Sequence, residues 1–250
     1  MRSFLFSTLF ACVFHSCQST LNNFGQPGTY FPAPEHLAAG VVNKYYFHYQ
    51  SEDGYKKSTD IRYYQYKQLD EQRLSVSIYN PAFELTSRLI LRLQDDKMLV
   101  EDEIRRFRGE TLNANLEDNV FLNWKQDSAV YSSTVHYPYG ISERVSWRQI
   151  ASKDSMLMNR PDKIITRQRK RHYQYTDKED RHHQTDITTT YVQGFGLFSS
   201  RYDFEDGTGS LELIRQMPLT TFETLSRKVP TRVAFIDPNN TLDSFSTFAP

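Results

Sequence analysis

Apolar and polar residues alternate along most of the chain. In the segment RLSVSIY, Leu74, Val76 and Ile78 fall on one face of an extended strand, and the serines between them fall on the other. The same period of two continues through residues 85–93 and 198–204. Because successive side chains of a strand point to opposite faces, this period predicts half-buried β-strands, roughly eleven to thirteen of them.

Short clusters of Gly, Pro, Asn and Asp separate these runs, as at residues 53–54 and 206–207. The clusters follow one another too closely for the crossover helices that parallel strands need, so they favour an antiparallel meander. Helical patterns are confined to one turn at 35–40 and a short segment at 220–228. We therefore expect an all-β fold: a single curved antiparallel sheet or half-barrel, with few short helices.

The N-terminus reads MRSFLFSTLFACVFHSC and has the build of an export signal. Arg2 supplies a positive charge, and the mostly apolar stretch Phe4–Phe14 suits a signal peptide and is too short to span a bilayer. The residues Phe14–Cys17 resemble the lipobox of bacterial lipoproteins, with a bulky apolar residue three positions before the cysteine and a small residue just before it. The resemblance implies that diacylglycerol is attached to the sulfur of Cys17 and that the leader is then removed.

The chain has two cysteines, Cys12 and Cys17, and their positions agree with a lipid anchor. Cys12 would leave with the leader and Cys17 would carry the lipid, so no thiol would remain for a disulfide in an oxidising compartment. Gln18 follows Cys17. In enteric lipoproteins Asp at that place favours the inner membrane, so the resemblance implies the outer membrane, facing the periplasm. His15 departs from the commonest lipobox, and a simple secretory leader or an apolar strand remains an alternative.

The sequence divides into four parts. Residues 1–16 form the signal peptide, and residues 17–38, rich in Pro and Gly, form the lipidated N-terminus and a flexible tether. Residues 39–236 form the β domain, and residues 237–250 form an irregular C-terminal tail. We therefore expect one folded domain held at a membrane by its lipid anchor.

The charge balance argues against a nucleic-acid partner, because 30 basic residues are offset by 30 acidic ones. One local run stands out, RQRKR, whose basic residues are Arg167, Arg169, Lys170 and Arg171. Aromatic residues follow it, and such a run can contact anionic lipid head groups or an anionic polysaccharide. A solvated strand face, balanced by the acids just downstream, is the alternative.

Signatures of catalysis are weak. Glu101, Asp102 and Glu103 offer carboxylates that could divide acid and base roles, but arginines follow them and favour cross-strand charge pairs. The histidines near His172 lack the spacing of a metal site, and the chain contains no GxSxG motif. We expect no cofactor, no metal and no catalysis; an envelope hydrolase acting through Glu101, Asp102 or His172 stays an alternative.

The segment Tyr191–Ile214, YVQGFGLFSSRYDFEDGTGSLELI, resembles a hairpin in families of uncharacterised bacterial envelope β-proteins. Some of those families share the shape of the lipoprotein carriers LolA and LolB, which are incomplete barrels around an apolar cavity. The resemblance implies a curved sheet and transfers no catalytic residue. The partner would be an apolar ligand in the concave face or an envelope protein, and a structural or assembly factor is the alternative. Alternation alone does not distinguish a closed core from an open cavity.

Overall fold

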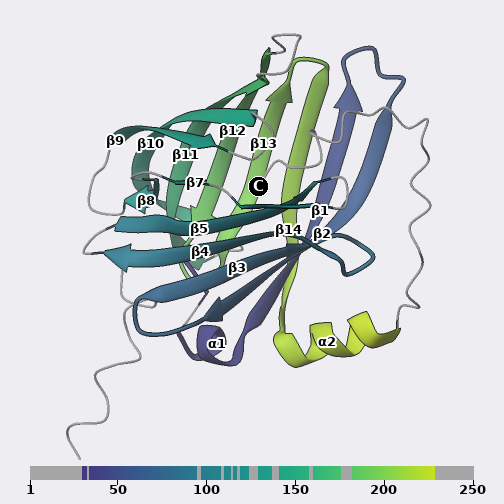
Figure 1. Ribbon diagram of the computed structural model, residues 1–250. Coiled ribbons are helices and arrows are strands. Elements are labelled where there is room, and N and C mark those ends of the chain that lie inside the picture. Colours follow the sequence, from purple (N-terminus) through teal and green to yellow (C-terminus); the bar gives the residue numbers. More distant parts are fainter. Residues whose placement is uncertain are drawn as a thin grey trace, which may run out of the picture.

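Antiparallel strands make up nearly the whole of the computed structural model (Figure 1). The structure describes residues 30–228, except 33, 95–96, 108–109, 114, 117–118, 124–128, 137–140, 158–159 and 176–181. Within this part of the chain lie one sheet of fourteen strands and two short helices. The all-β fold expected from the alternation is confirmed.

The elements follow the predicted pattern of alternating runs and turns. They are α1 (Pro34–Ala39), β1 (Val41–Ser51), β2 (Lys57–Gln68), β3 (Arg73–Tyr79), β4 (Leu85–Gln94), β5 (Lys97–Phe107), β6 (Glu110–Asn113), β7 (Asn115–Leu116), β8 (Val120–Asn123), β9 (Ala129–His136), β10 (Ile141–Leu157), β11 (Arg160–Tyr175), β12 (His182–Val192), β13 (Gly196–Phe204), β14 (Gly207–Pro218) and α2 (Leu219–Lys228). The strands exceed the expected number because β6, β7 and β8 are too short for an alternation to predict them.

Two meanders are joined where the first and last strands meet. The order across the sheet is β6-β5-β4-β3-β2-β1-β14-β13-β12-β11-β10-β9-β7, and all pairings are antiparallel. β1 pairs with β14 along its whole length, from Val41 opposite Pro218 to Ser51 opposite Gly207. This long-range pairing places the N-terminal and C-terminal halves of the domain side by side in one sheet.

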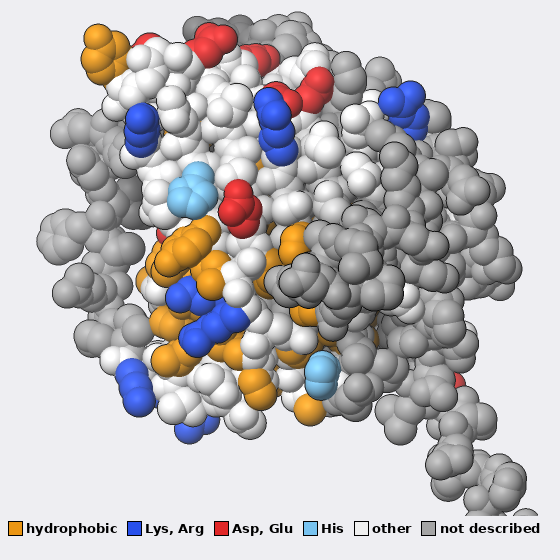
Figure 2. Space-filling model, turned by 180° about the vertical axis from the view of Figure 1, so that it is seen from behind, with side chains coloured by type: hydrophobic (Ala, Val, Ile, Leu, Met, Phe, Trp, Pro, Cys, Tyr) orange, Lys and Arg blue, Asp and Glu red, His pale blue; other side chains and the backbone are white. Residues whose placement is uncertain are grey.

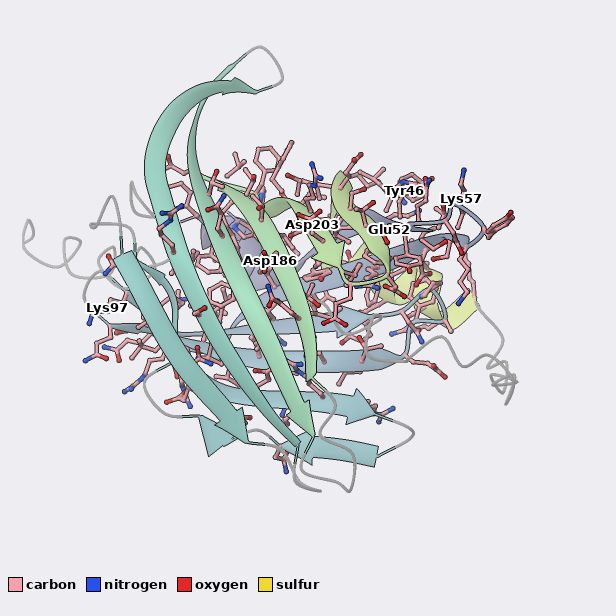
Figure 3. The ribbon with its side chains drawn as sticks, turned by 90° about the horizontal axis from the view of Figure 1, so that it is seen from above. Tyr46, Glu52, Lys57, Lys97, Asp186 and Asp203 are labelled. Atoms are coloured by element: carbon pink, nitrogen blue, oxygen red, sulfur yellow. The ribbon has the colours of Figure 1, made fainter. Side chains whose placement is uncertain are left out.

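The sheet curls so that its two ends approach each other. The outer edge of β5 pairs with both β6 and β8, while β7, which lies between those two in the chain, pairs with β9 at the other end. Seen from above, the long strands bend round, and the labelled Asp186 and Asp203 come from the neighbouring strands β12 and β13 (Figure 3). The result is the expected half-barrel, with a concave and a convex face.

The concave face carries the main core, and its aromatic residues alternate along the strands. Tyr45, Phe47 and Tyr49 of β1 are buried there, as are Tyr64 and Tyr66 of β2. Fully buried residues from several strands complete the cluster: Leu74, Leu91, Met98, Leu122, Tyr202 and Leu211. The core is therefore rich in tyrosine, which brings hydroxyl groups into an apolar interior.

Helix α2 covers part of the convex face. It starts directly after β14, and the ring centroid of Phe222 lies 5.3 Å from that of Tyr63 and 5.1 Å from that of Tyr79. With Val42 and Met217 these residues form a second apolar cluster. The helix expected over 220–228 is confirmed, and Phe222 in its first turn explains why Val42 on the convex face of β1 is buried as well as Val41 on the concave face.

The N-terminal segment is packed rather than extended. Tyr30, Phe31 and Leu37 are buried in the main core, and Pro32 makes an isolated parallel bridge with Gly194. The described residues 30–32 and 34–38, which we expected in the flexible tether, thus belong to the folded domain, because Tyr30, Phe31 and Leu37 bury apolar surface there. The signal peptide, Cys17 and the tail 237–250 lie outside the described residues. Neither described helix is long and apolar enough to cross a membrane.

Candidate functional site: the concave face

A small cavity of about 30 Å³ lies within the concave face. Its walls come from six strands and the N-terminal segment: Phe31, Tyr64, Tyr66, Val76, Ile78, Leu89, Phe121, Thr189, Tyr191 and Leu197. Such a volume holds about one or two water molecules. This part of the concave face is therefore a nearly filled aromatic core with a residual gap.

Tyr64 lines that gap and carries a buried hydroxyl group. Its side chain is 3% exposed, and its hydroxyl oxygen has no hydrogen-bond partner among the described residues. The Tyr45 ring packs edge-on against the Tyr64 ring, with centroids 4.8 Å apart. Burial raises the pKa of the Tyr64 hydroxyl well above its usual value, so the group is a neutral donor. Leaving such a donor unsatisfied costs about 1–3 kcal/mol, which an acceptor placed in the cavity would recover.

A second tyrosine hydroxyl is held in a buried network. Tyr45 donates to the carbonyl oxygen of Leu197 at 2.6 Å and accepts from the Asn43 side-chain amide at 3.1 Å. That amide also donates to the carbonyl oxygen of Phe195 at 2.8 Å, and Gln216 donates to the Asn43 side-chain oxygen at 3.0 Å. Burial raises the pKa of Tyr45 as well. The network fixes the chain at the start of β13 against β1 and β14.

The N-terminal segment closes one side of the cavity. Phe31 is 2% exposed, and its ring centroid lies 6.5 Å from that of Tyr66 and 6.4 Å from that of Phe121. Phe121, on β8, packs in turn against Tyr191 of β12 at 5.8 Å. Phe31 therefore joins aromatic rings from opposite parts of the curled sheet. A closed core, rather than an open cavity, describes this region.

The basic run lies in β11, where the pleat of the strand divides it between two faces. Three of its residues stand opposite buried residues of β12: Arg167 opposite Thr189, Arg169 opposite Ile187 and Arg171 opposite Thr185. Lys170 stands opposite the partly exposed Asp186, at a convex-face position. The structure describes the backbone of these four residues and not their side chains. Three of the four basic residues thus occupy concave-face positions of the sheet.

The carboxylates of β5 form ion pairs. Glu101 lies 3.7 Å from the Arg92 guanidinium on β4 and 4.0 Å from that of Arg73 on β3, and all three side chains are exposed. Glu103 is buried and paired with Arg105. The expected cross-strand charge pairs form at Glu101, whose partners are arginines of β3 and β4, whereas Glu103 pairs within its own strand with the adjacent Arg105.

The three residues of the hydrolase alternative do not share a site. Glu101 pairs with convex-face arginines, Asp102 stands opposite Ile90 on β4, and His172 stands opposite Gln184 on β12. β5 and β11 are separated by seven strands in the sheet order, and convex positions of a curled sheet diverge. Among the described residues, no group of three or more His, Cys, Asp or Glu could hold a metal ion.

The convex face is mixed in character (Figure 2). Tyr46 and Ile214 are 42% and 40% exposed there, and Lys44 stands opposite Arg215 between β1 and β14. Figure 2 shows such apolar and basic side chains side by side, with acidic ones nearby. Scattered apolar residues of this kind are ordinary on a solvated surface, so the concave face remains the more distinctive one.

Tyr64 and the Asn43 network are features that sequence reasoning missed. The alternating tyrosines of β1 and β2 were visible as a pattern, but the same pattern fits any half-buried strand. Which hydroxyl finds a partner depends on the chain at 195–197, which is distant in sequence. The sequence indicated the site only through the many tyrosines of β1 and β2, which pair with each other.

No protein-family model matches the chain, and no curated protein does. Solved structures do match it. One is a protein of Parabacteroides distasonis designated a lipoprotein, with 10% identity, a TM-score of 0.45, and coverage of 75% of this chain and 98% of that one. Another is a protein of Bacteroides fragilis designated an exported protein with a YmcC-like fold, with 9% identity, a TM-score of 0.46 and the same coverage. At these identities the resemblance carries no residue role to this chain.

Proposed function

We propose that this protein is a lipoprotein of the bacterial cell envelope that acts by binding through the concave face of its half-barrel, without catalysis. A lipid on Cys17 anchors it in the outer membrane, with the domain facing the periplasm. The lipobox-like residues Phe14–Cys17 support the anchor. The observation that carries the binding function is the buried hydroxyl of Tyr64, a residue that lines the aromatic cavity; this hydroxyl has no hydrogen-bond partner among the described residues.

A largely aromatic cavity lined by a few hydroxyl groups suits an apolar molecule that carries an oxygen acceptor. The present gap, about 30 Å³, is smaller than such a molecule. Binding therefore requires an aromatic side chain to move, and Phe31 is the candidate because it lies on the N-terminal segment and not on a strand of the sheet. Among the described residues, the backbone of that segment forms one isolated bridge with the sheet, between Pro32 and Gly194. Displacing it would leave the rest of the sheet intact.

The test uses N-phenyl-1-naphthylamine, a neutral dye that fluoresces in apolar surroundings, with the full chain carrying Cys17→Ala. We expect saturable binding. In the Phe31→Ala variant we expect binding about tenfold tighter, because the dye no longer displaces a buried ring worth about 1.5–3 kcal/mol. Phe222→Ala is the matched control: it removes the same ring from the convex-face cluster and should leave dye affinity unchanged.

Two results would overturn the binding function. One is the absence of dye binding in both the parent chain and Phe31→Ala. The other is an equal gain in Phe31→Ala and Phe222→Ala, which would mean that general loosening admits the dye. A single discrete protein crosslinked in intact cells, with no dye bound, would favour the assembly factor instead.

The anchor is tested separately by labelling cells with a palmitate analogue. The natural chain should be labelled and Cys17→Ala should not, and an inhibitor of lipoprotein signal peptidase should cause the precursor to accumulate. Fractionation should place the labelled protein in the outer membrane. Secretion of both forms without label would contradict the anchor and leave the binding function untouched.

A further inference from the structure

We propose that the concave face binds an anionic amphiphile, with its acidic head group at Arg167, Arg169 and Arg171 of β11 and its apolar part along the aromatic core. This rests on the proposed binding function and specifies the chemical class of the ligand. The proposal is based on the register of β11. This register places the residues of the basic run, which are consecutive in the sequence, on two different faces of the sheet.

Each of the three arginines stands on the concave face, in a row of paired residues that crosses neighbouring strands. Residues directly opposite one another in an antiparallel pair lie on the same face. The partners on β12 are Thr189, Ile187 and Thr185, all buried, and Thr189 lines the cavity itself. The row of Ile187 continues to the fully buried Tyr202 on β13. The basic positions of β11 are therefore the direct continuation of the aromatic core.

No carboxylate stands directly opposite these arginines in the pairings that the structure describes. On β10 the opposite residues are Gln149, Trp147 and Val145. Lys170 differs, because its position opposite Asp186 on the convex face supplies a cross-strand acid (Figure 3). The nearest acidic position of the same face on β10 is Glu143, opposite Tyr173, one row beyond Arg171.

Two acids of the concave face lie on strands that do not pair with β11. Glu103 of β5 forms an ion pair with Arg105, and Asp60 of β2 stands opposite Phe47. The same face carries another guanidinium on β2, since Arg62 is 6% exposed with its central carbon 3.9 Å from the centre of the Phe47 ring. The face thus combines cations with aromatic rings.

This combination selects an amphiphile over a small anion. A guanidinium binds a carboxylate or phosphate through paired, charge-assisted hydrogen bonds, and these strengthen where water is excluded. The positions beside Arg169 are Trp147 and Ile187, which are apolar or aromatic. An amphiphile whose head group is bound at β11 would therefore have apolar surface directly beside it for its acyl chain.

The test compares dodecyl phosphate, dodecanol and inorganic phosphate as competitors for the dye in the full chain carrying Cys17→Ala. The first two share a tail, and the first and third share a head group. We expect dodecyl phosphate to bind about tenfold more tightly than dodecanol, and inorganic phosphate not to compete at millimolar concentration. The preference should fall below about threefold in the variant R167Q/R169Q/R171Q.

Lys170→Gln is the matched control, because it removes an adjacent positive charge from the convex face. It should keep the tenfold preference. If the triple variant does not fold, Arg169→Gln alone and the effect of 0.5 M salt on the parent chain serve instead, since screening should reduce the preference. Loss of preference confined to the concave-face variants would support the proposal.

The contrary outcomes separate this inference from the proposed function. Equal affinity for dodecyl phosphate and dodecanol would overturn the head-group site and leave apolar binding standing. Inorganic phosphate competing as well as dodecyl phosphate would show a simple anion site and overturn the amphiphile. An equal loss in Lys170→Gln would assign the effect to overall charge and also overturn the proposal. No dye binding at all would remove the proposed function itself.

Discussion

The hydroxyl group of Tyr45 on β1 donates a 2.6 Å hydrogen bond to the carbonyl oxygen of Leu197 on β13. β14 lies between those two strands, so the bond ties together three neighbouring strands of the sheet. The same hydroxyl accepts from Asn43, which is itself completely buried. Through this one side chain, the start of β13 is held over the concave face.

Tyr45→Phe should destabilise the domain by about 1–2 kcal/mol, because it removes a donor from a fully buried network. Urea unfolding followed by circular dichroism measures the loss. Tyr49→Phe is the control, since its hydroxyl bond to the Asp206 carbonyl oxygen is longer, at 3.3 Å, and less enclosed. We expect its cost to be less than half as large. Equal losses would mean that the network adds nothing beyond an ordinary tyrosine hydroxyl.

Gly196→Ala and Gly194→Ala should destabilise the domain by similar amounts. Both glycines have positive φ, +84° and +82°, so both substitutions strain the backbone by about 1 kcal/mol. A Cβ at Gly196 would lie 3.4 Å from Pro32 and Tyr66, which is ordinary van der Waals contact, and one at Gly194 meets nothing within 4 Å. Urea unfolding measures both losses. A clearly larger cost at Gly196 would show that Pro32 and Tyr66 cannot accommodate the added methyl group.

The domain should lose stability as the pH rises above about 10, where tyrosines of the unfolded chain ionise. Burial raises the pKa of Tyr45, Tyr64 and Tyr66 in the folded state, so these hydroxyls keep their protons while the unfolded chain releases them. Each contributes stability that is complete below pH 10 and falls by up to about 1.4 kcal/mol per pH unit above it.

Absorbance at 295 nm and circular dichroism, recorded together between pH 9 and 12.5, check this behaviour. Phenolate absorbance from the buried tyrosines should appear together with loss of the sheet signal, in one cooperative step. Tyr64→Phe should move that step to higher pH, because one of the linked protons is removed. Phenolate forming smoothly while the sheet signal stays constant would show that these hydroxyls are open to solvent.

Glu101→Gln should change stability by less than about 1 kcal/mol, because its ion pairs with Arg73 and Arg92 are exposed and long. Chemical denaturation at low and at 0.5 M salt measures the effect, which salt should reduce further. Glu103→Gln, at a buried pair, is the contrasting variant and should cost more. A large cost at Glu101 would mean that the carboxylate does more than balance surface charge.

Local periodicity was sufficient to predict the strands. Leu74, Val76 and Ile78 lie on the concave face and α2 begins one residue before its predicted start, because strand and helix periods are properties of a few consecutive residues. The predicted tether includes Tyr30 and Phe31, which the structure places in the main core. No pattern in the neighbouring sequence indicates that these two side chains are buried. Burial of an isolated aromatic depends on distant strands.

The chain alone predicted an antiparallel β protein, indicated an export signal and contained a basic run, because alternation, the N-terminal pattern and charge are read from neighbouring residues. Only the tertiary structure decided that β1 pairs with β14, that Tyr64 is left without a hydrogen-bond partner among the described residues, and that alternate arginines of β11 stand opposite buried residues. Register and curvature make that decision: β1 and β14 pair residues more than a hundred positions apart, and the polar pattern of β11 does not by itself show which of its residues stand opposite the buried residues of β12.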